Sequence, residues 1–252
     1  MRRAVWRAGG AACLCVLAAC ATSPPPRIAY HPEAHPGVRR IVIVDAGPTR
    51  LGFTSSATQG IAQAMSGHFL SLVALTPVLL VALGADKLLE EELNVRVQSV
   101  SFDYGDALAE ALAVRLTAGG YDVARVSVPR PGSSDGRGWI DDYRGWIGAG
   151  DAVLDVAAPH AGYTAISAWE DYRPVAVVCV RMVLPSQRRI ALRECYWHGL
   201  SLPQYDTFQI TTDGLPGFAS WDELIAVPAK TADGLRRSAK AIAEHIASDL
   251  GP

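Results

Sequence analysis

The sequence predicts an α/β (α+β) domain: a single sheet of about five to six strands with helices packed on it, a C-terminal hairpin and a terminal helix. Short β-branched apolar runs alternate with stretches of helical period through most of the chain. The 252 residues, half of them hydrophobic and 19% charged, are enough for one large or two small cores. The balance of 23 basic against 25 acidic groups excludes the basic surface that nucleic-acid binding requires.

The N-terminus has the pattern of a bacterial lipoprotein signal peptide. Three arginines within residues 2–7 precede the apolar run 8–19, which is too short to span a bilayer as a helix. The run ends in LAAC at residues 17–20, which resembles the lipobox of bacterial lipoproteins. The resemblance implies that residues 1–19 are removed and that Cys20 receives acyl chains, palmitate among them. An ordinary cleaved signal with a fortuitous cysteine is the alternative.

The residues that follow Cys20 indicate a location and a tether. The residue after Cys20 is Ala21, whereas an aspartate at this position would retain a lipoprotein in the inner membrane. This favours the outer membrane, with the inner membrane as the alternative. Three arginines and no acidic residue leave with the signal, so the net charge changes from −2 to −5 and the acyl chains would be the anchor. Residues 20–38 are rich in proline and predict a semi-rigid tether before a periplasmic domain over 39–252.

The first half of this domain contains clear signals for strands and one helix. Residues 41–44 are apolar and β-branched and predict a buried strand, while residues 94–100 alternate and predict a strand with one wet face. Asp103 predicts the N-cap of a helix over 104–117, whose leucines recur every four residues and which a glycine pair ends.

Residues 51–85 form an uncharged apolar insertion between these elements. The pair Thr76-Pro77 resembles a helix start and predicts that one helix ends near Leu75 and another runs from Pro77 through Glu92. Three interpretations are open: a helical hairpin buried on the sheet, a membrane-contacting or oligomer-forming face, and a transmembrane helix.

The second half of the domain is rich in strands. Residues 121–128 and 151–157 predict two strands, the second of which 163–167 extend. The stretches 174–184 and 190–197 predict a β-hairpin.

The loop over residues 132–150 is rich in glycine and contains two Gly-Trp-Ile copies. Exposed aromatic side chains in such a loop would be a binding surface, and their burial as a lid over the core is the alternative. The candidate partner surface consists of Trp139, Tyr143 and Trp146.

The register of the hairpin brings two cysteines together. If Leu184 faces Ile190, Cys179 lies directly opposite Cys195, at a Cα separation within disulfide range. A disulfide between them is credible in an oxidising periplasm, and two reduced cysteines in a buried hairpin are the alternative. Beyond the hairpin, the sequence predicts an irregular segment over 203–227 and a terminal helix over 235–250.

This order of elements resembles that of the small periplasmic lipoproteins related to curli-secretion CsgG and to the penicillin-binding-protein activator LpoB. The resemblance is carried by the segment DAVLDV at 151–156, the Arg188-Arg189 turn and the alanine-rich last helix, and it covers about residues 39–250. It implies an α/β domain resembling the anticodon-binding fold and a non-enzymatic role in assembly, secretion or activation. The apolar insertion departs from the compact activators and does not resemble the amphipathic strands of CsgG-type pores.

The sequence contains no signature of catalysis. It has no nucleophile elbow, zinc-binding helix motif, phosphate-binding loop or dinucleotide fingerprint. His160 and His198 fall near strand ends, where a base–orienter pair with Asp155 or Glu194 is conceivable, but strand-end histidines are more often structural. We therefore expect no catalytic residue, metal or cofactor.

These observations predict a lipid-anchored cell-envelope protein that faces the periplasm and acts as a non-enzymatic binding or assembly component. Its partners would be the membrane, through the lipid, and a protein or a second copy of itself, without nucleic acid. One alternative is a membrane-inserting oligomeric component of secretion or pore type, built through residues 61–84. Another is a periplasmic hydrolase.

Overall fold

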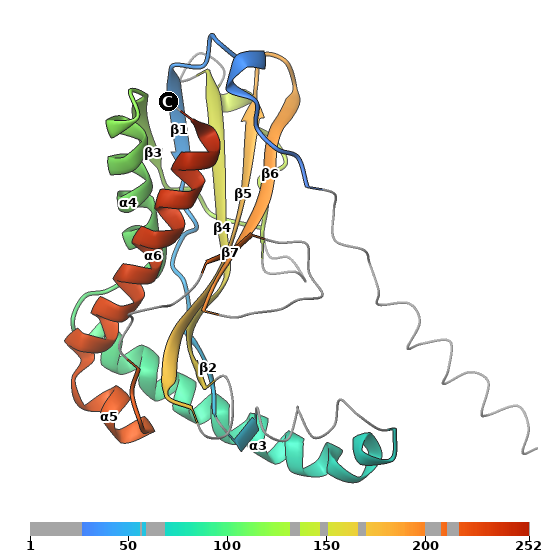
Figure 1. Cartoon of the computed structure of the whole chain (residues 1–252), viewed down its shortest axis with the longest axis vertical. Helices are drawn as coiled ribbons and strands as arrows, with labels where there is room; N and C mark the ends of the chain where they lie inside the picture. The colour runs from blue at the N-terminus through green and yellow to red at the C-terminus, as the bar shows by residue number, and fades with distance from the viewer. Residues whose placement is uncertain are drawn as a thin grey trace, which may run out of the picture.

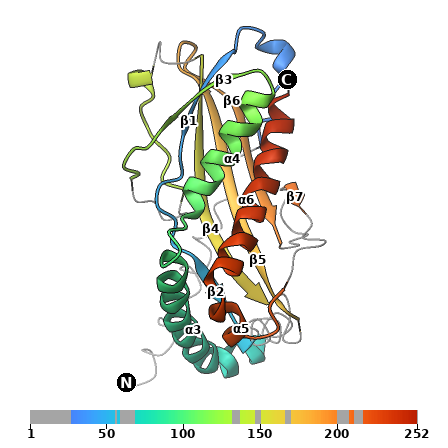
Figure 2. The ribbon, with the colours of Figure 1, turned by 90° about the vertical axis from the view of Figure 1, so that its left-hand side faces the viewer.

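The computed structural model describes residues 27–55, 57–58, 69–131, 137–146, 151–165, 170–199, 208–210 and 217–251. They form an α+β domain in which helices pack on one mixed, seven-stranded sheet, as Figures 1 and 2 show. The predicted fold class is therefore confirmed. The strand count exceeds the expected five to six because two three-residue strands extend the sheet.

The strands are β1 (Arg40–Val44), β2 (Gly52–Thr54), β3 (Asp122–Val126), β4 (Ala152–Ala165), β5 (Tyr172–Leu184), β6 (Arg189–His198) and β7 (Phe208–Ile210). The helices are α3 (Phe69–Gln98), α4 (Tyr104–Ala118), α5 (Trp221–Ala226) and α6 (Pro228–Leu250), with 3₁₀ turns η1 (Pro32–Ala34) and η2 (Arg144–Trp146).

The sheet has a parallel half and an antiparallel half. Its strand order is β3-β1-β4-β5-β6-β7, and β2 pairs with the far end of β4. Strands β3, β1 and β4 run parallel, whereas β4, β5 and β6 form an antiparallel meander. The apolar run of β1 is buried because β1 lies between β3 and β4 with side chains covered on both faces.

Helices α4 and α6 lie side by side over one face of the sheet (Figure 2). The leucines of α4 that recur every four residues are fully buried there, and Asp103 caps the helix as predicted, accepting a hydrogen bond from Asp106 N at 3.0 Å. On α6, a Cβ at Gly234 would lie 2.3 Å from the Tyr163 hydroxyl, so only glycine permits this approach to β4. That hydroxyl donates a hydrogen bond to the Thr231 carbonyl at 2.8 Å.

Helix α3 corrects two predictions. Residues 94–98 belong to its last turns, so the strand expected over 94–100 is wrong. Leu93 and Val97 are both buried in the main core, four residues apart, which is a helical spacing that the short alternating pattern concealed. The helix also continues through Thr76-Pro77, because a proline removes one helical hydrogen bond without necessarily ending the helix, so the hairpin interpretation is wrong. In the part of the chain described, no helix meets the length and hydropathy needed to cross a membrane.

The second half of the predicted tether is packed on the domain. Residues 27–38, called here the N-terminal strap, run beside β6 (Figure 1). Ile28 exchanges two main-chain hydrogen bonds with Arg193, of 2.9 and 2.8 Å, and Tyr30 is 7% exposed. The prolines restrict the strap but do not prevent burial of its apolar side chains, so residues 27–38 of the predicted semi-rigid tether are packed on the domain and do not hold it away. Cys20 and the signal lie outside the described residues.

The hairpin confirms the central part of the predicted register. Cys179 is the direct partner of Cys195, and the two are joined by a disulfide bond in the structure. A register shift after Met182 places Leu184 opposite Arg189, so the assumed pairing of Leu184 with Ile190 is wrong by one residue at the turn.

The segment predicted as irregular before the terminal helix contains two short elements. Strand β7 pairs in parallel with β6, and α5 is capped by Ser220, which accepts a hydrogen bond from Glu223 N at 3.2 Å. Helix α6 begins at Pro228, seven residues before the predicted start at Leu235, since proline suits the first helical position.

Candidate functional site

The face of the sheet opposite α4 and α6 carries a buried carboxylate. On β4, alternate side chains point to opposite faces, and Leu154 and Val156 belong to the core under the helices. Val153 belongs instead to a small second core with Val42 and Val44 of β1. Asp155 shares the face of Val153 and is fully buried.

The carboxylate of Asp155 is compensated from three sides. Arg130 Nη1 lies 2.8 Å from Oδ1, and Arg181 Nη2 lies 3.6 Å from Oδ2. The Ile140 amide donates to Oδ2 at 3.2 Å, and the Tyr143 hydroxyl donates to the same oxygen. Both hydrogen bonds that this acid accepts from Ile140 and Tyr143 fall on Oδ2, so the acid serves to hold their segment and the two guanidinium groups in place.

Arg130 joins the loop after β3 to the end of β1 and to the first half of β4. Its Nε donates to the Asp45 carbonyl at 2.9 Å, and its Nη2 donates to the Val44 carbonyl at 3.1 Å and to the Val156 carbonyl at 2.5 Å. Its Nη1 reaches the Gly138 carbonyl at 3.3 Å. This one side chain therefore ties the loop that follows to β1 and β4.

Residues 137–146, called here the aromatic loop, pack against this network. Arg181 lies over the rings of Trp139 and Tyr143, at 4.9 and 5.3 Å from their centroids. The Tyr143 and Trp146 rings are 6.0 Å apart and pack against the second core, and burial raises the pKa of the Tyr143 hydroxyl. All three aromatic side chains of the candidate partner surface are half-buried, so the loop is a lid whose outer part is accessible.

A cavity of about 460 Å³ opens between the aromatic loop and the turn of the β5–β6 hairpin. Four arginines and two aspartates line it together with an apolar wall. The lining residues are Ile140, Asp141, Asp142, Tyr143, Arg144, Arg181, Val183, Pro185, Arg188, Arg189 and Ile190. Its volume is within the range of small-molecule sites in proteins.

The charges of the cavity are unequally compensated. Arg144 holds Asp142 with two hydrogen bonds from Nε and Nη2, of 2.9 and 2.7 Å, which lower the pKa of Asp142 to about 2. The side chains of Arg188 and Arg189 have no hydrogen bond or ion pair with any residue that the structure describes. The cavity therefore offers uncompensated positive charge.

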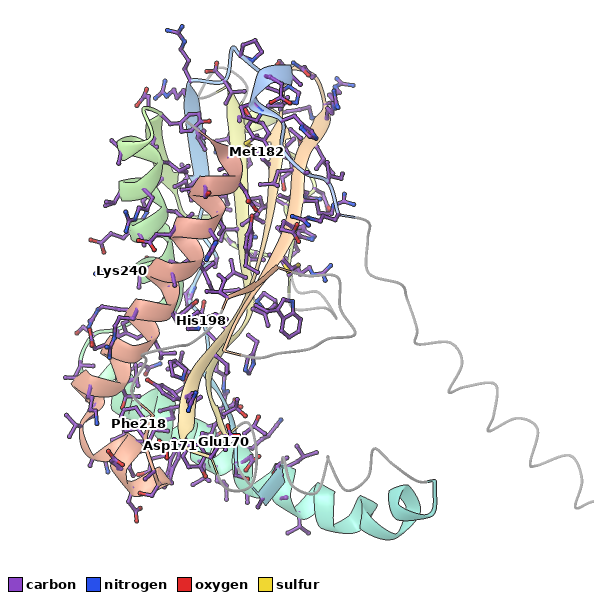
Figure 3. All side chains as sticks on the ribbon, viewed as in Figure 1. Glu170, Asp171, Met182, His198, Phe218 and Lys240 are labelled. Atoms are coloured by element: carbon purple, nitrogen blue, oxygen red, sulfur yellow. A yellow bond between two sulfur atoms is a disulfide. The ribbon has the colours of Figure 1, made fainter. Side chains whose placement is uncertain are left out.

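The two histidines considered for catalysis are not brought together with Asp155 or Glu194, the acids proposed for them. Burial lowers the pKa of His160, whose ring packs against Gly52, where a Cβ would lie 2.6 Å from it. His198 lies on the α6 side of the sheet (Figure 3), and burial lowers its pKa to about 4. Burial raises the pKa of Glu194, which pairs with Arg27. Neither histidine forms a hydrogen bond with Asp155 or Glu194 within the described ranges.

The described residues also contain no candidate metal centre. No group of three or more histidine, cysteine, aspartate or glutamate side chains is placed to hold an ion among the residues described.

Sequence reasoning missed the residues that hold the aromatic loop. The signal was present for Asp155, since an acid in the apolar run of β4 is rarely buried without a partner. Nothing in the sequence indicated that Arg130 and Arg181 are those partners, because they belong to segments far apart in the chain. The sequence indicated no binding role for Arg188 and Arg189, which supported only the resemblance to the periplasmic lipoproteins.

A second exposed surface lies on α3. Val81, Leu88 and Val95 are 74%, 70% and 66% exposed. They are seven residues apart and so share one face of the helix. This apolar stripe lies opposite the face that buries Leu93 and Val97.

Comparison with known proteins gives no family. No family model matches the chain, and no curated protein matches it in sequence. Among solved structures, the chain is similar to a dodecamer of a PelC variant from Paraburkholderia phytofirmans, with 10% identity over 90% of this chain and 96% of that chain. The TM-score is 0.35, at which the likeness carries no argument.

Proposed function

We propose that this chain is a lipid-anchored protein of the outer membrane, facing the periplasm, that acts as a non-enzymatic binding or assembly component. Cys20 is the anchor, and the aromatic loop is the contact surface. One observation supports this proposal: a largely buried charge network around Asp155 contacts Tyr143, which lines the cavity, and places Arg181 over the Trp139 ring. Trp146 packs against Tyr143 in the same loop. A surface that is ordered before binding loses less entropy when a partner arrives.

The same network argues against the hydrolase alternative. Asp155, the fully buried acid of this face, is committed to two arginines and a tyrosine. Neither His160 nor His198 forms a hydrogen bond with it among the described residues. A hydrolase would instead show an activity that disappears when either histidine is replaced.

Site-specific photo-crosslinking in the intact envelope tests the proposal. A photoreactive residue at position 139 or 146 of the full chain should crosslink to a discrete protein, or to a second copy of this chain. The matched control replaces Lys240, which projects from α6 on the opposite side of the sheet (Figure 3). Absence of crosslinks from the loop, or the same products from position 240, would contradict the proposal.

A membrane-inserting oligomer remains the second candidate because of the apolar stripe on α3. Exposed apolar side chains of this size favour contact with lipid or protein. Replacing Cys20 by serine and exchanging the signal distinguishes the two functions. A protein held only by its lipid becomes soluble, whereas an inserting protein stays in the membrane until Leu88 is changed to glutamate.

A further inference from the structure

We propose that the cavity between the aromatic loop and the β5–β6 turn binds a phosphate monoester carried on a ring or a short apolar body. This inference rests on the proposed function and deepens it by naming the ligand class of the same surface.

The charge of the lining favours a dianion. Four arginines face two aspartates in the cavity, which leaves an excess of two positive charges. Arg144 is neutralised by Asp142, and Asp155 behind the cavity is shared between Arg130 and Arg181. The excess is greatest at Arg188 and Arg189, whose side chains have no ion pair with any residue that the structure describes. A phosphate monoester carries a charge of about −1.5 to −2 at pH 7, whereas a carboxylate carries only one. The chain without residues 1–19 has a net charge of −5, so the positive charge of the cavity is a local feature of an otherwise acidic protein.

The geometry of the lining fits a phosphate with a body attached. Guanidinium groups bind phosphate oxygens through two parallel N–H donors. Arg181 is held in place by the Ile140 carbonyl at 2.9 Å and by the rings of Trp139 and Tyr143. Apolar side chains beside the arginines would contact the body of the ligand. They are Ile140, Val183, Pro185 and Ile190.

The backbone of the turn gives an independent observation. Arg188 has φ of +50°, in the left-handed region that glycine or asparagine adopts more readily. It is one of two non-glycine residues with positive φ in the described ranges, the other being Ser101. A long charged side chain at such a position is retained at a cost in stability, and strain of this kind concentrates at binding sites. Glycine at this position should therefore leave the fold as stable or more stable while removing a charge from the cavity.

Calorimetric titration of the full-length protein in detergent tests the inference. One arm uses a hexose phosphate, and the other uses soluble dihexanoyl-phosphatidic acid, so that a free phosphate ester and a lipid headgroup are distinguished. The unphosphorylated sugar and dihexanoylglycerol are the ligand controls. We expect saturable binding in at least one arm, weakening by about tenfold in Arg188→Gly and in Arg189→Gln. Lys240→Gln, on α6, is the charge-matched control and should bind as the unaltered protein does.

The outcomes separate cleanly. Preference for one probe identifies the source of the phosphate, and loss of affinity in Arg188→Gly without loss of melting temperature supports the inference. Binding of neither probe overturns it, as does an unchanged affinity in both arginine variants or an equal loss in Lys240→Gln. Because the crosslinking experiment above uses no phosphate, crosslinks from the loop combined with a negative titration would remove only the ligand assignment and leave the proposed function standing.

Discussion

Asp155 of β4 and Arg181 of β5 are direct cross-strand partners, and both side chains point to the face of the sheet that the aromatic loop covers. Arg181 donates to the Tyr143 hydroxyl at 2.5 Å and to the Ile140 carbonyl at 2.9 Å, while Asp155 accepts from the same tyrosine. The loop is therefore positioned by one cross-strand ion pair in the sheet.

Replacing Asp155 by asparagine should strongly destabilise the domain. The change leaves Arg130 and Arg181, which are 12% and 16% exposed, without their shared counter-charge. Loss of one partner of a buried ion pair costs about 3 kcal/mol in the free energy of unfolding. Urea titration followed by tryptophan fluorescence measures this loss. The control is Asp122→Asn, which removes a surface pair on β3 and should cost less than about 0.5 kcal/mol. A loss below about 1 kcal/mol for Asp155→Asn would show that the network is not required.

Removing the disulfide of the hairpin should lower stability without changing the fold. Cys179 and Cys195 are 16 residues apart in the sequence, and closing a loop of this length stabilises by about 3 kcal/mol. The double variant Cys179→Ser, Cys195→Ser should show this loss in urea titration and keep the circular dichroism spectrum of the unaltered protein. Mass spectrometry of the unreduced, digested protein should show the two peptides joined. Two free thiols in protein isolated from the envelope would contradict the prediction.

The N-terminal strap should behave as part of the domain. Tyr30 is 7% exposed and packs into the main core, so Tyr30→Ala should reduce the free energy of unfolding by about 3 kcal/mol. His31→Ala is the neighbouring control, since its side chain is exposed, and it should cost less than about 0.5 kcal/mol. Equal, small effects of both changes would restore a free tether over 27–38. If Cys20 carries the proposed lipid, the seven-residue step from Cys20 to Arg27 allows at most ~25 Å between that lipid and the docked strap.

Stability should fall between pH 6.5 and pH 4 because of His198. Burial lowers the pKa of this histidine from 6.5 to about 4, an effect partly offset by its hydrogen bond to the main chain at Pro174. The unfolded chain therefore takes up a proton in this range that the folded protein excludes. The stabilisation is complete above pH 6.5 and is lost towards pH 4, by roughly 3 kcal/mol in total. His160 acts in the same direction, whereas the raised pKa of Glu194 acts in the opposite one.

The variant His198→Gln isolates this contribution from the other titrating groups. Urea titrations at several pH values should show a slope of stability against pH that is shallower than that of the unaltered protein, by up to ~1.4 kcal/mol per pH unit. The exposed His31→Gln serves as control and should keep the original slope. Identical slopes for all three proteins would refute the assignment to His198.

Most of the longer strands and the cap of α4 were predictable because their signals are local. The apolar run of β1 and the cap at Asp103 each depend on a few adjacent residues. The opposition of Cys179 and Cys195 was predicted from a pairing at the turn that is off by one residue, and the register shift after Met182 restores the predicted pairing. The strand predicted over 94–100 is wrong because a seven-residue alternation is too short to distinguish a strand from the end of a long helix.

The sequence by itself determined the class of the domain and the residues that form most strands, and it predicts the lipid anchor at Cys20. Only the tertiary structure decided which face of the sheet each charged side chain occupies and what meets it there. Arg130, Asp155 and Arg181 come from the loop after β3 and from two strands, and their meeting depends on strand order and pleat. The burial of Tyr30 against the main core likewise joins segments distant in the chain. Hydrophobic period and capping act between neighbours in sequence, whereas ion pairing and packing act between neighbours in space.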